Sequence, residues 1–118
     1  MSNSLFAITI DSTDAPALAR FWGTVLDRKI AEEPSDSEHV VLLADEAGSG
    51  PRLVFNKVPE PKVIKNRVHL DVISDTFDAE TERLLSLGAR KLRDLGGDDW
   101  RWTTFADIEG NEFDLIAG

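Results

Sequence analysis

The sequence contains no cysteine and only two histidines among its 118 residues. Without cysteine the chain has no disulfides, no thiolate catalysis and no sulfur-ligated metal site. Any metal ion must therefore be held by imidazole, carboxylate and water.

Basic residues and long apolar runs are also scarce. The chain has 13 Lys and Arg against 22 Asp and Glu, a formal charge of −9 that repels nucleic acid and anionic membranes. A neutral or cationic ligand suits it better. The longest apolar runs, such as residues 40–44, fall far short of the roughly 20 residues that span a bilayer. The N-terminal residues lack the features of a secretory signal, so we expect a cytoplasmic protein without nucleic-acid or membrane partners.

Several common enzymatic patterns are missing. There is no glycine-rich phosphate loop, no Gly-x-Ser-x-Gly and no His-Glu-x-x-His, which disfavours nucleotide hydrolysis and triad chemistry. The length and the 42% hydrophobic content are typical of one packed, soluble domain.

The first half of the chain predicts a β-α-β-β-β order. Alternation over residues 6–11 predicts a strand. A helix follows, capped by Asp14 and ending near Asp27, with Trp22 on its apolar stripe. Three extended pieces are expected at residues 29–33, 38–44 and 52–56, separated by turn formers at 34–37 and 45–51.

The second half repeats this order after a proline-containing connector. A strand is predicted over residues 66–72, with His69 and Asp71 on one face, and a helix over about 79–87, capped by Asp75 or Asp78 and closed by Gly88. Extended pieces are expected at residues 90–93, 100–107 and 111–116. Because neither half could readily bury enough surface alone, we expect their sheets to pair and share a concavity.

Several segments carry a resemblance to a known family: Ala19-Arg20-Phe21-Trp22, Pro51-Arg52-Leu53-Val54-Phe55, Lys65-Asn66-Arg67-Val68-His69-Leu70-Asp71 and Asp107-Ile108-Glu109-Gly110-Asn111-Glu112-Phe113. With these the chain resembles the vicinal-oxygen-chelate superfamily of glyoxalase, bleomycin-resistance and extradiol-dioxygenase proteins, and more narrowly the short glyoxalase-like domains of actinobacteria. The resemblance implies an α+β fold in which two tandem βαβββ modules pair into a curved mixed sheet with a shared concave site. A single domain over residues 1–118 would hold module one at about 5–57, a linker at about 58–65 and module two at about 66–117. A homodimer is a further implication.

The resemblance also implies a metal site. In the superfamily the ligands come from the first and last strands of each module, and His69 and Glu112 match these positions in module two. The equivalent positions in module one hold Thr9 and Arg52, which are not usual ligands. The chain thus keeps about half of the donor set for a divalent ion such as Zn, Ni, Mn or Fe.

The residues around this site have alternative interpretations. Glu112 shares a strand face with Asp114 and could abstract a proton beside a carbonyl, particularly if burial raises its pKa, or it could pair with Arg52. His69 could bind metal, or be a buried histidine hydrogen-bonded to Asp71.

Other side chains are candidates for ligand binding. Arg52 could clamp a ligand carboxylate or phosphate, and Thr9 could add a hydroxyl. Trp102 shares a strand face with Trp100 and Thr104 and could form an aromatic wall, or pack in the core. Asp114 would face the same site as Glu112.

Two functions follow from this interpretation. The first is a glyoxalase-like lyase or isomerase in which a metal stabilises an enediolate while a carboxylate moves the proton. The second is a non-catalytic protein that sequesters an antibiotic or metabolite, for which aromatic walls and negative charge favour a cationic, partly planar compound. Extradiol dioxygenase chemistry needs two histidines and one carboxylate, and only one suitably placed histidine is present.

Overall fold

The structure is a computed structural model that describes residues 4–32, 37–44, 50–97 and 99–118. The chain divides into two compact units, Met1–Pro61 and Lys62–Gly118, which correspond to the two halves of the sequence repeat. The turns expected at 34–37 and 45–51 fall mostly outside the described residues.

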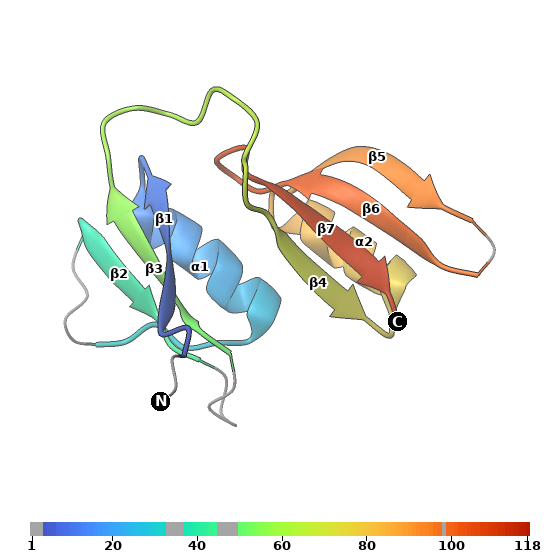
Figure 1. The fold of residues 1–118 in the computed structure, drawn as a ribbon, viewed down its shortest axis with the longest axis horizontal. Helices are drawn as coiled ribbons and strands as arrows, with labels where there is room; N and C mark the ends of the chain where they lie inside the picture. The colour runs from blue at the N-terminus through green and yellow to red at the C-terminus, as the bar shows by residue number, and fades with distance from the viewer. Residues whose placement is uncertain (1–3, 33–36, 45–49, 98) are drawn as a thin grey trace. The chain divides into compact units, whose positions relative to one another are not determined.

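The first unit contains a three-stranded sheet and one helix. Its elements are β1 (Ala7–Ser12), α1 (Ala15–Leu26), β2 (His39–Leu42) and β3 (Arg52–Lys57). The strand order is β1-β3-β2, with β1 parallel and β2 antiparallel to β3 (Figure 1). The strand expected at residues 29–33 is reduced to one bridge between Ile30 and Leu42. This bridge occupies the fourth place in the strand order, beyond β2.

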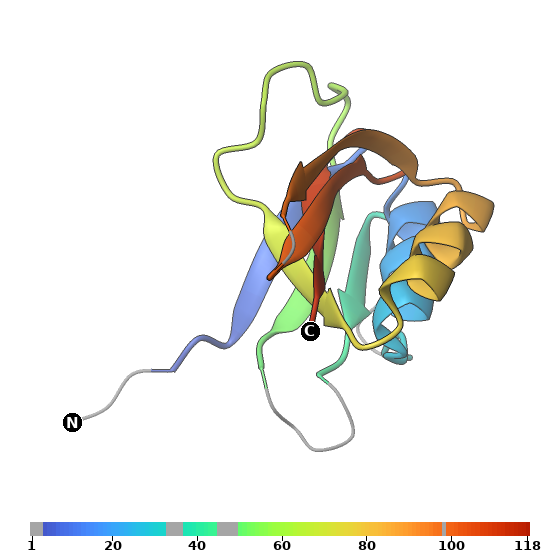
Figure 2. The ribbon, with the colours of Figure 1, turned by 90° about the vertical axis from the view of Figure 1, so that its right-hand side faces the viewer.

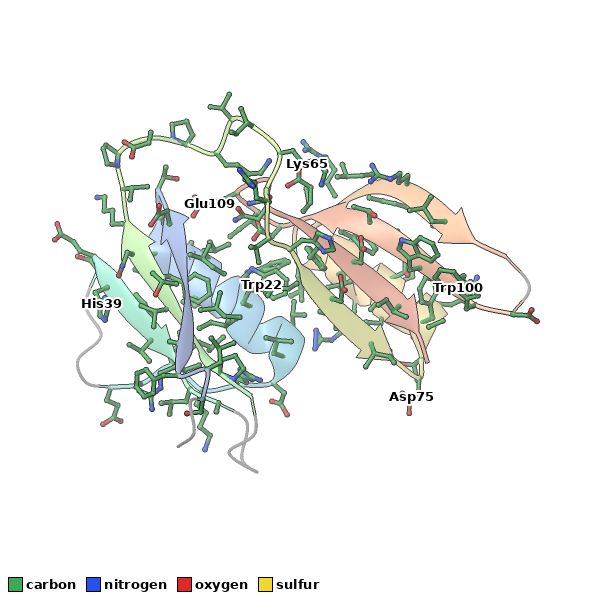
Figure 3. All side chains as sticks on the ribbon, in the orientation of Figure 1. Trp22, His39, Lys65, Asp75, Trp100 and Glu109 are labelled. Atoms are coloured by element: carbon green, nitrogen blue, oxygen red, sulfur yellow. The ribbon has the colours of Figure 1, made fainter. Side chains whose placement is uncertain are left out.

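Helix α1 begins and ends as the sequence predicts. The side chain of Asp14 accepts a hydrogen bond of 3.2 Å from the backbone N–H of Ala17, and Asp27 ends the helix in the left-handed conformation with φ 53°. Its apolar stripe packs on the sheet, and Trp22 is only 2% exposed, as expected of a core residue (Figure 3).

The second unit repeats the topology with a full set of strands. Its elements are β4 (Leu70–Ser74), α2 (Phe77–Ser86), β5 (Arg90–Gly96), β6 (Arg101–Ala106) and β7 (Glu112–Ala117). The order is β4-β7-β6-β5, with β4 parallel to β7 and the other pairs antiparallel (Figure 1). Helix α2 lies along one face of this sheet (Figure 2). The predicted α+β class and the doubled βαβββ order are therefore confirmed.

Three boundaries in the second unit differ from the prediction by two residues or more. Helix α2 starts after Thr76, not after Asp75 or Asp78, because the hydroxyl of Ser74 accepts a hydrogen bond from the N–H of Thr76 and turns the chain into the helix there. Strand β4 starts only at Leu70, and β5 continues to Gly96 past a bulge between Lys91 and Arg93.

A tight turn connects β6 to β7. The buried carboxylate of Asp107 accepts hydrogen bonds from the backbone N–H groups of Glu109 and Asn111, at 2.9 and 3.0 Å, and from the Asn111 side chain. Gly110 has φ +90°, a conformation that glycine adopts without strain. The turn fixes where β7 begins, and therefore which face Glu112 and Asp114 occupy. Within the described residues, no helix is long and apolar enough to cross a membrane.

Gly88 follows α2 with φ +106°, and a Cβ built on it would lie 3.0 Å from Cγ2 of Ile108. We expect Gly88→Ala to lower the free energy of unfolding by about 1–2 kcal/mol, because an L-residue is strained at this φ. The matched control is Gly97→Ala, where a Cβ meets nothing within 4 Å. Equal melting temperatures for the two variants would contradict this prediction.

Candidate functional site

The candidate site lies on the face of the four-stranded sheet opposite α2. Phe105, Phe113 and Leu115 are buried on the face that α2 covers. Strand alternation therefore places Asp71, Asp114 and Thr104 on the other face, where the register aligns Asp71 with Asp114 and Asp114 with Thr104. The sheet thus carries a polar row across three neighbouring strands.

His69 stands beside this row, just before β4. Its Nδ1 lies 3.0 Å from Oδ1 of Asp71, and the two side chains are 41% and 52% exposed. The hydrogen bond to Asp71 was one of the alternatives predicted for His69, but the histidine is exposed and not buried. Its imidazole is therefore accessible to a ligand.

Asp114 completes a cluster with His69 and Asp71. One potential ligand atom from each residue lies within 4.8 Å of the others. The hydroxyl of Thr104, which is buried, donates a 2.6 Å hydrogen bond to Oδ1 of Asp114 and so fixes its orientation. Sequence reasoning placed Asp114 in the ligand site, and the structure brings it together with His69.

Glu112 has different neighbours. Its carboxylate lies 3.2 Å from Nζ of Lys62 and accepts a 3.2 Å hydrogen bond from the backbone N–H of Asn66. Burial alone would raise the pKa of Glu112, but the hydrogen bonds from its own N–H, from Asn66 and from Lys62 outweigh it, and the pKa is lowered. The raised pKa that would make Glu112 a better base is therefore not found.

An aromatic pair flanks the polar row. The rings of Trp100 and Trp102 stack with centroids 4.2 Å apart and planes 12° from parallel. Trp100 is 59% exposed and lies just before β6 (Figure 3). Trp102 pairs in register with Ile116, which pairs with Ile73, so an apolar row runs beside the polar one. Trp102 is thus adjacent to the candidate site, as the aromatic-wall interpretation requires.

A cavity of about 300 Å³ lies between the start of α2 and strands β5 and β6. Two ion pairs border it: Arg101 with Asp78 and Lys91 with Asp94, each at 2.7 Å. The complete lining comprises Phe77, Asp78, Thr81, Lys91, Asp94, Leu95, Arg101, Trp102 and Thr103.

The predicted site residues of module one lie in the first unit. The guanidinium of Arg52 sits 4.4 Å from the ring centroid of Phe6, and both residues line a cavity of about 540 Å³. Thr9 is exposed on the same sheet face as Arg52, since Ala7 pairs with Arg52 and Thr9 with Val54. Their part in ligand binding stays a prediction.

The donor set of the cluster suits a divalent metal ion. One imidazole and two carboxylates are ligands that Zn, Mn and Fe accept, and three protein donors leave positions open for water or substrate. Ligand atoms about 2.1 Å from a shared ion are at most about 4.2 Å apart, so the observed spread of up to 4.8 Å requires only a small side-chain movement.

The comparisons with known proteins agree with the fold. A family model described as "Glyoxalase-like domain" matches residues 7–116, and the chain belongs to this family. No curated protein matches the sequence significantly.

Solved structures share the architecture. A glyoxalase/bleomycin resistance protein/dioxygenase family enzyme from Burkholderia phytofirmans PsJN superposes with a TM-score of 0.77 at 20% identity, covering 98% of both chains. The fosfomycin resistance protein FosX from Mesorhizobium loti superposes with a TM-score of 0.76 at 20% identity, covering 100% of this chain and 94% of the other. A mutant of FosX from Listeria monocytogenes, complexed with Mn(II) and 1S,2S-dihydroxypropylphosphonic acid, superposes with a TM-score of 0.79 at 20% identity. The match covers 100% of this chain and 92% of the other. The resemblance to the superfamily is thus confirmed at the level of fold.

Sequence reasoning missed three residues. Asp71 was considered only as a partner of His69, although its alternation with His69 placed it on the same face. Lys62 and Asn66 were not connected to Glu112, because they lie 50 and 46 residues from it and no local pattern joins them to it.

The lowered pKa of Glu112 has a consequence for stability. A carboxyl whose folded pKa lies below its ordinary 4.5 stabilises the fold above that pH, and the stabilisation is lost as the pH falls through the lowered pKa. We expect Glu112→Gln to cost about 1 kcal/mol near pH 7 and nothing at strongly acidic pH. Thermal unfolding measured from acidic to neutral pH gives this difference in stability. Glu82→Gln, which changes an exposed carboxylate, is the control. A constant difference at every pH would contradict the prediction.

Proposed function

We propose that this protein acts on a small molecule with the help of a divalent metal ion, which His69, Asp71 and Asp114 would bind. The observation that carries the proposal is the juxtaposition of these three side chains on one sheet face. Two carboxylates directly opposite each other on neighbouring strands repel. A bound cation would relieve that repulsion, and His69 supplies an imidazole nitrogen as the third donor.

The surrounding residues support such a site. Nδ1 of His69 and Oδ1 of Asp71 lie 3.0 Å apart, a separation that two ligand atoms of one ion can have. The hydroxyl of Thr104 donates to Oδ1 of Asp114, which would leave Oδ2 for the ion. The FosX structure that holds Mn(II) has the same fold, which is consistent with a metal in this architecture.

The proposed reaction is that of a glyoxalase-like lyase or isomerase. A bound divalent ion would supply Lewis-acid polarisation of a substrate oxygen, which stabilises an enediolate. Trp102 and Ile116 would form an apolar wall beside that substrate. Metal coordination and proton transfer by Glu112 remain predictions from the sequence alone. In the structure its carboxylate oxygens accept hydrogen bonds from Lys62 and Asn66.

The metal site is tested by calorimetric titration of the purified protein with Mn²⁺ and Zn²⁺. We expect one binding event per chain, weakened at least about 10-fold by His69→Ala or Asp114→Asn, since each removes a ligand. The matched controls are His39→Ala, which removes the histidine of the first unit that contacts Asn56 at 2.6 Å, and Asp75→Asn, which removes an exposed carboxylate at a turn. If neither metal binds the wild-type protein, the proposed site does not exist.

A second candidate function is non-catalytic binding of a planar compound. The stacked Trp100 and Trp102 favour it, because an exposed aromatic pair beside an apolar row is a platform for another ring. The net charge of −9 favours a cationic ligand. Such a protein sequesters its ligand and needs no metal.

Tryptophan fluorescence tests this second candidate. We expect planar aromatic cations to quench it at saturable concentrations and to raise the melting temperature, and we expect Trp100→Ala to weaken binding by about 0.5–1.5 kcal/mol, the contribution of one ring pair. Phe6→Ala, which removes an exposed aromatic ring in the first unit, is the control. A screen in which planar cations leave both fluorescence and melting temperature unchanged would count against it.

The homodimer and the concavity shared by the two modules, which the superfamily resemblance implies, are also proposals. Sedimentation at several concentrations distinguishes a dimer from a monomer.

A further inference from the structure

A group of four polar residues joins the segment before β4 to the start of β7. Asn66 and Glu112 form a reciprocal pair: the N–H of Asn66 donates to Oε2 of Glu112 at 3.2 Å, and the N–H of Glu112 donates to Oδ1 of Asn66 at 2.9 Å. The side chain of Asn66 also donates to Oδ1 of Asn111 at 3.1 Å, and Lys62 reaches Glu112 at 3.2 Å. We refer to these four residues as the clamp.

The hydrogen bonds of the clamp begin where the pairing of β4 with β7 ends. The β4–β7 register begins with Leu70 opposite Phe113, so an extended ladder would next place His69 opposite Glu112. The N–H of Glu112 instead donates to the side chain of Asn66. An amide side chain thus replaces a backbone carbonyl as the hydrogen-bond partner at this position.

The clamp restricts the backbone next to His69. Residues 67–69 lie between two points fixed to the same strand, Asn66 at Glu112 and Leu70 at Phe113. His69 lies outside β4, and its exposed side chain contacts Asp71. With its backbone tethered on both sides, the chain can present the imidazole beside Asp114 with less loss of conformational entropy.

The contacts of Glu112 fit a part in this tether better than a part in coordination. Both of its carboxylate oxygens accept hydrogen bonds, one from Lys62 and one from Asn66. We propose that Asn66 and Glu112 are positioning residues, which hold the segment before β4 on β7 and thereby place His69 for metal binding. The inference rests on the proposed function, since it assigns these residues a role in the metal site defined above.

Two variants of Glu112 separate positioning from coordination. Glu112→Gln keeps an oxygen acceptor for the N–H of Asn66 but removes the carboxylate that a metal would require, whereas Glu112→Ala removes both. Positioning predicts Mn²⁺ affinity close to wild type in Glu112→Gln and about 10-fold weaker in Glu112→Ala. Equal weakening in the two variants would identify Glu112 as a ligand and overturn the inference.

Asn66→Ala supplies an independent test. It removes the contacts to the N–H of Glu112 and to Asn111, and we expect about 10-fold weaker Mn²⁺ binding at a temperature where thermal unfolding shows the variant to be folded. Asn56→Ala, which removes the amide that contacts His39 in the first unit, is the matched control. Wild-type Mn²⁺ affinity in folded Asn66→Ala would overturn the inference while leaving the metal site intact. If Asn66→Ala does not fold, the comparison of Glu112→Gln with Glu112→Ala tests the inference instead.

A metal-free measurement distinguishes failure of the inference from failure of the proposed function. The imidazole Cε1–H resonance of His69 reports its conformation by nuclear magnetic resonance without any ion. If the wild-type protein binds no Mn²⁺, the proposed function fails, and this resonance decides the positioning. A shifted or broadened His69 signal in Asn66→Ala supports it, and an unchanged signal overturns it.

Discussion

The parallel pairing of β4 with β7 is the constraint on which the candidate site depends. Because side chains alternate along strands, the register of Leu70 with Phe113 decides that Asp71 lies opposite Asp114 on the face away from α2. A shift of one residue would turn Asp114 toward the helix and Phe113 toward solvent, and burial of Phe113 at 1% exposure opposes such a shift. The hydrophobic core of the second unit therefore sets the geometry of its polar face.

The polar face carries an electrostatic cost that the fold only partly offsets. Asp71 and Asp114 are like charges in adjacent positions, and the hydrogen bonds from His69 and Thr104 satisfy one oxygen of each. Natural sequences retain such unfavourable pairs chiefly where function requires them. The arrangement is the physical basis for proposing that a cation belongs there.

The two modules share a topology but differ in how they are packed. Helix α1 buries a stripe of six residues, whereas α2 buries only Leu84. Strand β5 is exposed along nearly its whole length, and the bridge at Ile30 replaces it in the first unit. The unit with the less extensive core carries the metal-capable cluster, while the unit with the larger core carries Thr9 and Arg52, which offer no comparable donors.

Local patterns in the sequence determined the α+β class, the doubled βαβββ order, the cap of Asp14 and the turn at Gly88, because periodicity and capping depend on near neighbours. The family resemblance added His69 to the site, and strand alternation placed Asp114 on one face with Glu112. Only the tertiary structure decided that His69 and Asp71 meet Asp114 while Glu112 meets Lys62 and Asn66. The reason is that these contacts join residues about 45 positions apart through strand register, and register is set by burial of the whole sheet and not by any local segment.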